Sequence, residues 1–79
     1  MDLVRQALIT SRGERSQVEV AQAVEINQRY LSKLELGKGN PSAKVMARLA
    51  QYYQKPVEYL FPDIFFDPDY AKIEYYKKA

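Results

Sequence analysis

The chain has 79 residues, of which 12 are Lys or Arg and 10 are Asp or Glu, and a chain of this length forms one small domain with a thin core. It has no cysteine and no histidine, which excludes disulfides, His/Cys metal sites and the usual catalytic base and thiol nucleophile, so we expect no enzyme activity and no cofactor. No apolar run approaches the roughly 20 residues of a membrane span and no signal-peptide layout opens the chain, so we expect a cytoplasmic protein without membrane contact.

Two helices are predicted in the first third of the chain. The first covers residues 2–12, with Asp2 in its first turn and Gly13 as its stop. Its apolar stripe is Leu3, Val4, Ala7 and Leu8. Ser16 has the side chain of a helix N-cap, so a second, short helix is predicted after it. The apolar stripe of this second helix is Val20, Ala21 and Val24.

A third helix is predicted in the middle of the chain. Glu25 and Ile26 interrupt the second helix, and Asn27 is a favourable N-cap for the next one, which runs to about Leu36. Gly37 closes this third helix because glycine commonly follows the last helical residue. A polar loop, "GKGNPS", then leads to the next helix.

Two more helices are predicted before residue 62. Ser42 is the N-cap of a fourth helix, which Pro56 bounds. Its apolar side is Val45, Met46, Leu49, Ala50 and Tyr53. A short fifth helix, "PVEYLF" (56–61), follows. Since no segment alternates as a strand would, the predicted fold class is all-α, with five compact helices.

The third helix has two different faces. At about 100° per residue, its polar side chains fall on one arc, whereas Leu31 and Leu34 point the opposite way. The polar arc consists of Gln28, Arg29, Ser32 and Lys33. Arg and Gln offer the paired donors and acceptors that match guanine and adenine edges in the major groove of DNA. The alternative is an ordinary solvated face, and the basic surplus of residues 27–48 does not by itself decide between the two.

The second and third helices together carry a family resemblance. Their apolar residues have the spacing at which two helices cross steeply around a tight turn, and Ala21 is small where they would approach. Through "SQVEVAQAVEINQRYLSKLELGKGNPS" (16–42) and "LAQYYQKPVEYLF" (49–61), the chain resembles the phage repressor and Cro-like (XRE-type) helix-turn-helix family. The resemblance implies a five-helix, lambda-repressor-like DNA-binding domain over residues 1–61.

The resemblance also implies roles for individual residues. The residues expected to contact DNA bases are Gln28, Arg29, Ser32 and Lys33. Those expected to contact the DNA backbone are Gln17, Asn27, Tyr30, Lys38, Asn40, Ser42 and Lys44. Gln17 would be helped by the amide end of the second helix, and Tyr30 has an equally good alternative as a half-buried packing residue.

Four residues depart from the family pattern: Thr10, Arg15, Glu25 and Gln54. Glu25 and Gln54 replace usual glycines, so Glu25 is either strained at positive φ or part of an altered turn. Arg15 replaces a usual apolar residue. Thr10 stands where an arginine often pairs with Glu35, and Arg12 is a candidate to take over that pairing.

The last segment, "PDIFFDPDYAKIEYYKKA" (62–79), lies beyond the resemblance. Asp67 is a suitable N-cap with Pro68 at the first helical position, so this C-terminal extension is predicted to add a sixth helix. The residues expected to form a dimer interface are Ile64, Phe65, Phe66, Tyr70 and Ile73. The alternative is that the extension packs on its own domain.

The function expected from these patterns is a sequence-specific transcriptional regulator, a repressor that binds a palindromic double-stranded DNA operator as a homodimer. No small-molecule ligand is indicated. The alternative is an antitoxin-like or adapter protein whose main partner is another protein, bound through the aromatic extension.

Overall fold

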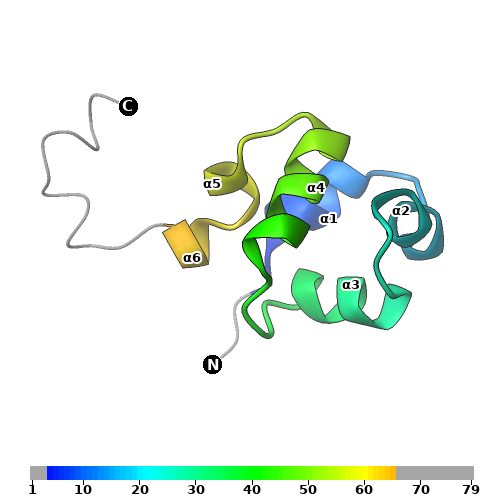
Figure 1. Cartoon of the computed structure of the whole chain (residues 1–79), viewed down its shortest axis with the longest axis horizontal. Helices are drawn as coiled ribbons and strands as arrows, with labels where there is room; N and C mark the ends of the chain where they lie inside the picture. Colours follow the sequence, from blue (N-terminus) through cyan, green and yellow to red (C-terminus); the bar gives the residue numbers. More distant parts are fainter. Residues whose placement is uncertain (1–3, 66–79) are drawn as a thin grey trace, which may run out of the picture.

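The computed structural model describes residues 4–65. This part of the chain contains six short helices joined by turns and loops, and no strand (Figure 1). The helices are α1 (Gln6–Arg12), α2 (Gln17–Val24), α3 (Gln28–Glu35), α4 (Ala43–Tyr53), α5 (Val57–Leu60) and α6 (Pro62–Phe65). The predicted all-α class and the first five helices are confirmed. The helix predicted to begin at Asp67 lies outside the described residues, and α6 is a separate short helix that the sequence pattern did not indicate.

Side-chain caps begin three of the helices as predicted. Ser16, Asn27 and Ser42 each accept a hydrogen bond from a backbone N–H in the first turn of the helix that follows, at distances of 2.7 to 3.2 Å. Each cap satisfies one of the amide groups that a helix N-terminus leaves without an internal partner. The starts of α2, α3 and α4 are therefore determined by residues that adjoin them in the sequence.

The start of α1 differs from the prediction. The helix begins at Gln6 rather than near residue 2, and Val4, which was assigned to the apolar stripe, is 50% exposed. Its neighbour Arg5 is buried instead, and the Arg5 backbone N–H donates to the Glu35 carbonyl at 2.9 Å. The prediction was wrong here because a period-based reading places apolar residues inside and arginine outside, whereas this arginine has partners in distant segments.

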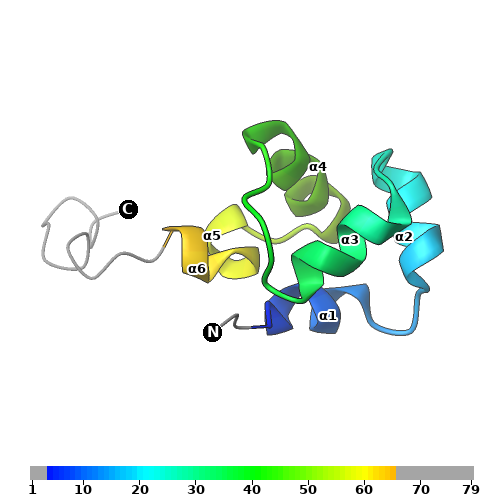
Figure 2. The same cartoon turned by 90° about the horizontal axis from the view of Figure 1, so that it is seen from below.

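The core lies between all of the first five helices. Its buried apolar members are Leu8, Val20, Ala21, Val24, Leu31, Leu34, Met46, Leu49, Tyr53, Leu60 and Phe61. In Figure 1, α3 lies along the lower edge of the molecule, and in Figure 2, seen from below, it crosses with α1 beneath it and α4 above it. Helix α3 contacts α2 and α1. Its residues Leu31 and Leu34 are buried in the core, whereas most polar side chains on its other face are exposed.

Two residues in the turns have left-handed backbone conformations. Glu25 has φ 62° and ψ 46°, and Gln54 has φ 57° and ψ 48°. These are conformations that glycine adopts without penalty and that cost a residue with a β-carbon about 1 kcal/mol. Of the two possibilities for Glu25, the structure therefore has the strained residue at positive φ and not an altered turn.

The first residues of the C-terminal extension pack on the domain. Ile64 and Phe65 are half-buried against the core, and Asp63 pairs with Arg5. The other residues assigned to a dimer interface, Phe66, Tyr70 and Ile73, lie outside the described part of the chain.

Candidate nucleic-acid interface

The α2–turn–α3 unit presents one face of α3 outward. Leu31 and Leu34 are fully buried, and Ala21 of α2 is 2% exposed where the two helices approach each other. The Ile26 backbone N–H donates to the Ala21 carbonyl at 2.9 Å, which ties the turn to the end of α2. Because the two leucines hold α3 along its inner side, its outer side is left for a ligand.

The predicted base-contacting residues share that outer side. Gln28, Arg29 and Lys33 are exposed, and Ser32 is half-buried. A shallow hollow runs along this surface, and the residues that line it are Asn27, Gln28, Arg29, Tyr30 and Lys33. Tyr30 is half-buried and packs against the core, which is the packing role left open for it. The hollow is open to solvent and its lining is mainly polar.

A chain of hydrogen bonds connects this surface to the interior. Gln28 Nε2 donates to Gln17 Oε1 at 2.7 Å, and Gln17 Nε2 donates to Glu35 Oε1 at 2.8 Å. Both amide atoms of Gln17 thus have protein partners, so a phosphate contact at Gln17 has to use its backbone N–H at the start of α2 or a rearranged side chain. The same contacts hold the Gln28 amide in one orientation, which reduces the entropy lost when it binds.

Glu35 is the last residue in this series of hydrogen bonds, and its carboxylate forms a buried ion pair with Arg12. Its carboxylate is 3% exposed and receives two bonds from Arg12, Nε to Oε2 at 2.7 Å and Nη2 to Oε1 at 3.0 Å. The hydrogen bond to Glu35 is the largest cause of a raised pKa of Arg12, against which burial acts. Arg12 therefore supplies the pairing for which Thr10 is unsuited, as expected.

Arg15, which replaces a usual apolar residue of the family, stacks on two tyrosine rings. Its guanidinium carbon lies 5.0 Å from the ring centroid of Tyr52 and 5.5 Å from that of Tyr53. It also donates to the carbonyls of Ser11 and Arg12, at 2.7 and 3.1 Å, at the end of α1. Stacking on two rings and capping a helix C-terminus are both favourable for arginine, so this departure from the family pattern has local compensation.

Four of the residues predicted to contact the DNA backbone lie in the α3–α4 loop and at the start of α4. Lys38, Asn40, Ser42 and Lys44 are all exposed, although the Ser42 hydroxyl also caps α4. Within residues 4–65 none of the lysines in this region, nor Arg29, forms an ion pair. These cations are therefore available to neutralise phosphate groups.

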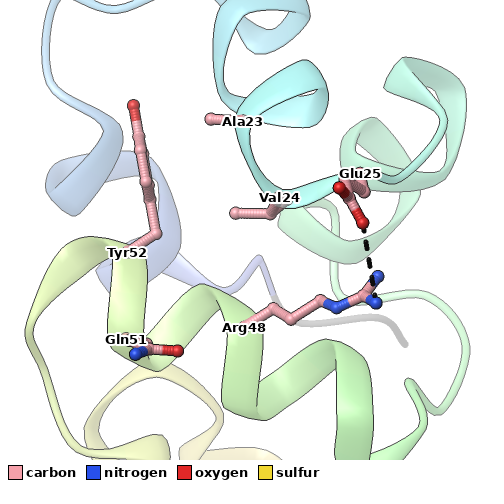
Figure 3. A pocket seen from close by; sticks show the side chains of 6 residues that line it. All are labelled: Ala23, Val24, Glu25, Arg48, Gln51 and Tyr52. Atoms are coloured by element: carbon pink, nitrogen blue, oxygen red, sulfur yellow. Dashed lines mark ion pairs between the residues drawn. The ribbon is translucent and has the colours of Figure 1, made fainter.

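Arg48 lies within the basic segment of residues 27–48, but its side chain is paired with Glu25. Figure 3 shows it across an open hollow between α2 and α4, with Nη2 3.7 Å from Glu25 Oε1. The other residues that line this hollow are Ala23, Val24, Gln51 and Tyr52. The Arg48 guanidinium and the Glu25 carboxylate face each other across the hollow, so Arg48 adds little to the positive potential around α3.

One buried cation was missed by the sequence analysis. The side chain of Arg5 is 2% exposed and contacts Asp63, the Leu34 carbonyl in the last turn of α3 and the Gly39 carbonyl in the loop after it. Nothing near it in the sequence signals this, because Asp63 lies 58 residues away.

Elsewhere among residues 4–65, no group of three acidic side chains could hold a metal ion, and no helix of that range is long and apolar enough to cross a bilayer.

Two helices that cross around a tight turn, the second with a polar face turned outward, define a helix-turn-helix DNA-binding domain. The model of the family HTH_3, described as helix-turn-helix, matches residues 4–60, which is more than half of the chain. The chain therefore belongs to this XRE-type, Cro/C1-like family of DNA-binding transcription regulators. A search of curated proteins and a search of solved structures each gave no match.

Proposed function

We propose that the protein is a transcriptional repressor that binds a palindromic operator as a homodimer through the major groove. The observation that carries this proposal is the outward face of α3, where Gln28, Arg29 and Lys33 are exposed while Leu31 and Leu34 are buried. An exposed polar arc on a helix held by its other side is the form in which helix-turn-helix domains read base edges.

The base contacts would come from the first half of α3. Arg29 would donate two hydrogen bonds from its guanidinium N–H groups to guanine O6 and N7, and Gln28 would pair with adenine N6 and N7. The hydrogen bond from Gln28 to Gln17 supports this assignment, because it holds one side of the Gln28 amide while no protein group occupies the other within residues 4–65. Ser32 and Lys33, one turn further along α3, would contact adjacent base edges or phosphates.

The backbone contacts would surround this reading surface. Asn27 and Gln17 lie at the N-termini of α3 and α2, where free amide groups favour phosphate oxygens. The other residues proposed to contact the backbone are Tyr30, Lys38, Asn40, Ser42 and Lys44. Each phosphate neutralised by a lysine would contribute a slope of about −0.9 to the dependence of log K on log salt.

A dimer is proposed because one α3 reads too few base pairs to be selective. Two copies on half-sites about 34–36 Å apart would combine their affinities. Apolar side chains from the extension supply the candidate interface, an isologous contact between equivalent residues of the two chains. These residues are Ile64, Phe65, Phe66, Tyr70 and Ile73. The aromatic character of the same segment is what favours the second candidate function, binding of a different protein.

Selection from random duplexes tests the proposal most directly. The expected result is an enriched palindrome whose half-sites are centred about 10 base pairs apart, bound with an affinity that falls steeply with salt. Failure to enrich any sequence, together with salt-independent binding, would overturn it. The dimer is tested separately by sedimentation of the full chain and of a chain ending at Phe65, which keeps α6 and its contacts: the full chain should be dimeric and the shortened one monomeric.

A further inference from the structure

The side chain of Arg5 joins three segments that are distant in the sequence. It is 2% exposed, and it contacts Asp63 in α6, Leu34 in α3 and Gly39 in the loop after α3. On one side it pairs with Asp63, from Nε to Oδ1 at 2.9 Å and from Nη2 to Oδ2 at 2.8 Å. The Phe61 ring centroid is 5.5 Å from its guanidinium carbon. This two-pronged pairing is the strongest geometry available to an arginine and a carboxylate.

On its other side Arg5 bonds to the backbone at the end of α3 and in the loop after it. Nη1 donates to the Leu34 carbonyl at 2.9 Å and to the Lys38 carbonyl at 3.5 Å, and Nη2 donates to the Gly39 carbonyl at 3.0 Å. With the bonds to Asp63, each of the three guanidinium nitrogens has at least one acceptor. The planar fork of arginine can serve this many acceptors at once, whereas a lysine ammonium cannot.

The loop that Arg5 contacts is also tied to α3 at its start, where the backbone N–H groups of Gly37 and Lys38 donate to the carbonyls of Leu34 and Lys33 at 3.1 and 3.0 Å. Gly37 and Gly39 flank Lys38 at φ 82° and 75°, and no atom lies within 4 Å of a β-carbon built on Gly39. Among residues 4–65, Arg5 is the only donor to the carbonyls of Lys38 and Gly39. Glycine backbones have wide conformational freedom, so the orientation of these two carbonyls depends on the Arg5 contacts.

We infer that Arg5 and Asp63 form a clamp that positions the loop of residues 37–40 for contact with the DNA backbone. The inference rests on the proposed DNA-binding function and extends it to Asp63, which lies beyond the family match at residues 4–60. Arg5 and Asp63 act as positioning residues, because the Arg5 side chain is buried and both carboxylate oxygens of Asp63 accept hydrogen bonds from it. Asp63 is needed since a buried guanidinium without a carboxylate is costly and would turn toward water, which would release the loop carbonyls.

Charge and position predict opposite effects for Asp63→Asn in the full chain. Loss of a negative charge alone should tighten binding to a polyanion. Loss of the clamp should weaken it, and we expect about three- to tenfold lower affinity for cognate and mixed duplexes alike, with base preference unchanged. Glu58→Gln is the matched control, because the substitution removes the same charge. Glu58 is exposed on α5 and has no ion-pair partner among the described residues. The variant should leave affinity equal or slightly higher.

Two further readouts separate positioning from general stability. If the clamp acts through Lys38, the slope of log K against log salt should be smaller in magnitude by about 0.9 for Asp63→Asn than for the unmodified protein. The same decrease is expected for Lys38→Ala. The double variant should then bind no more weakly than Lys38→Ala alone. Asp63→Glu, which keeps the carboxylate, should recover much of the affinity. Thermal melting without DNA shows whether each variant is folded.

Several outcomes would overturn the inference. These are equal affinities for Asp63→Asn and Glu58→Gln, an unchanged salt slope, or additive effects of Asp63→Asn and Lys38→Ala. If Asp63→Asn does not fold, Arg5→Lys provides the same comparison, because lysine keeps the charge but cannot bond to Asp63 and both carbonyls together. Failure of the unmodified protein to bind any duplex would instead contradict the proposed function itself.

Discussion

The two halves of α3 are held in different ways. The first half carries exposed side chains whose main protein contact is the hydrogen bond from Gln28 to Gln17. The second half ends between two arginines, with Arg12 on the Glu35 carboxylate and Arg5 on the Leu34 carbonyl. The comparison shows that a surface for base contacts can stay open when the same helix is fixed firmly at its other end.

The physical reason lies in the polarity of the helix. The last carbonyls of a helix have no partners within it and carry partial negative charge, so cations are favourable there. Arg5 satisfies two such carbonyls, Leu34 through its side chain and Glu35 through its backbone N–H. The first turn has the opposite polarity and attracts phosphate, so the free end of α3 is also the end suited to DNA.

The largest effect is expected when the held end is broken. Arg12→Met leaves the buried Glu35 without its cation and should destabilise the fold by about 3 kcal/mol or more. Denaturation by urea measures the loss. The control is Arg12→Met combined with Glu35→Leu, which removes both charges and should recover a large part of the stability. If the single variant lost less than about 1 kcal/mol, the ion pair would not be what fixes this end of α3.

A second test of the held end uses pH. Burial raises the pKa of Tyr53 to about 12, with a further contribution from the charge of Glu35, whereas an unfolded tyrosine titrates near 10. Because the folded-state pKa is the higher one, this contribution is complete below pH 10 and is lost as the pH rises from 10 to 12. The loss should reach about 2 to 3 kcal/mol.

Tyr53→Phe isolates that contribution from the other groups that titrate above pH 10. The Tyr53 hydroxyl is buried and has no hydrogen-bond partner among the described residues, so at pH 7 the variant should be as stable as the original or slightly more stable. Chemical denaturation of both proteins at pH 7, 10 and 11.5 measures the difference. An identical alkaline loss in the two proteins would contradict the raised pKa.

The free end of α3 should respond in binding and not in stability. Arg29→Ala or Gln28→Ala should cost about 1 to 3 kcal/mol on the selected site and relax preference at one or two base pairs. Lys38→Ala should weaken all duplexes alike. Titrations with cognate and single-substituted duplexes measure both effects. Unchanged base preference in both α3 variants would mean that this end is not the reader.

The smallest effect is expected at the turn that sets the angle of α3. Glu25→Gly relieves a β-carbon at φ 62° and should be neutral or stabilising by up to about 1 kcal/mol. The exposed contact to Arg48 at 3.7 Å that it removes contributes little. Arg48→Gln serves as the control for that contact. A clear loss of stability in a thermal melt of Glu25→Gly alone would show that the glutamate side chain contributes more than its backbone strain costs.

The sequence alone determined the local features of this protein. The N-caps at Ser16, Asn27 and Ser42 act on the turn that follows them, and the opposition of Leu31 and Leu34 to the polar arc of α3 follows from helical periodicity. The pairing of Arg12 with Glu35 was also predicted, although only through the family resemblance. These features could be predicted because each depends on neighbouring residues or on a spacing that the family shares.

The tertiary structure decided which charged residues are buried and by what they are held. Arginine is usually exposed, since an isolated charge is costly to bury, but in the structure Arg5 is buried and Arg15 is half-buried beside partners from other segments. For Arg5 the partner is Asp63 at the far end of the domain, and for Arg15 it is a pair of tyrosines on α4. The later start of α1 and the connection from Gln28 to the interior have the same origin, because both depend on contacts between segments that meet only when the chain is folded.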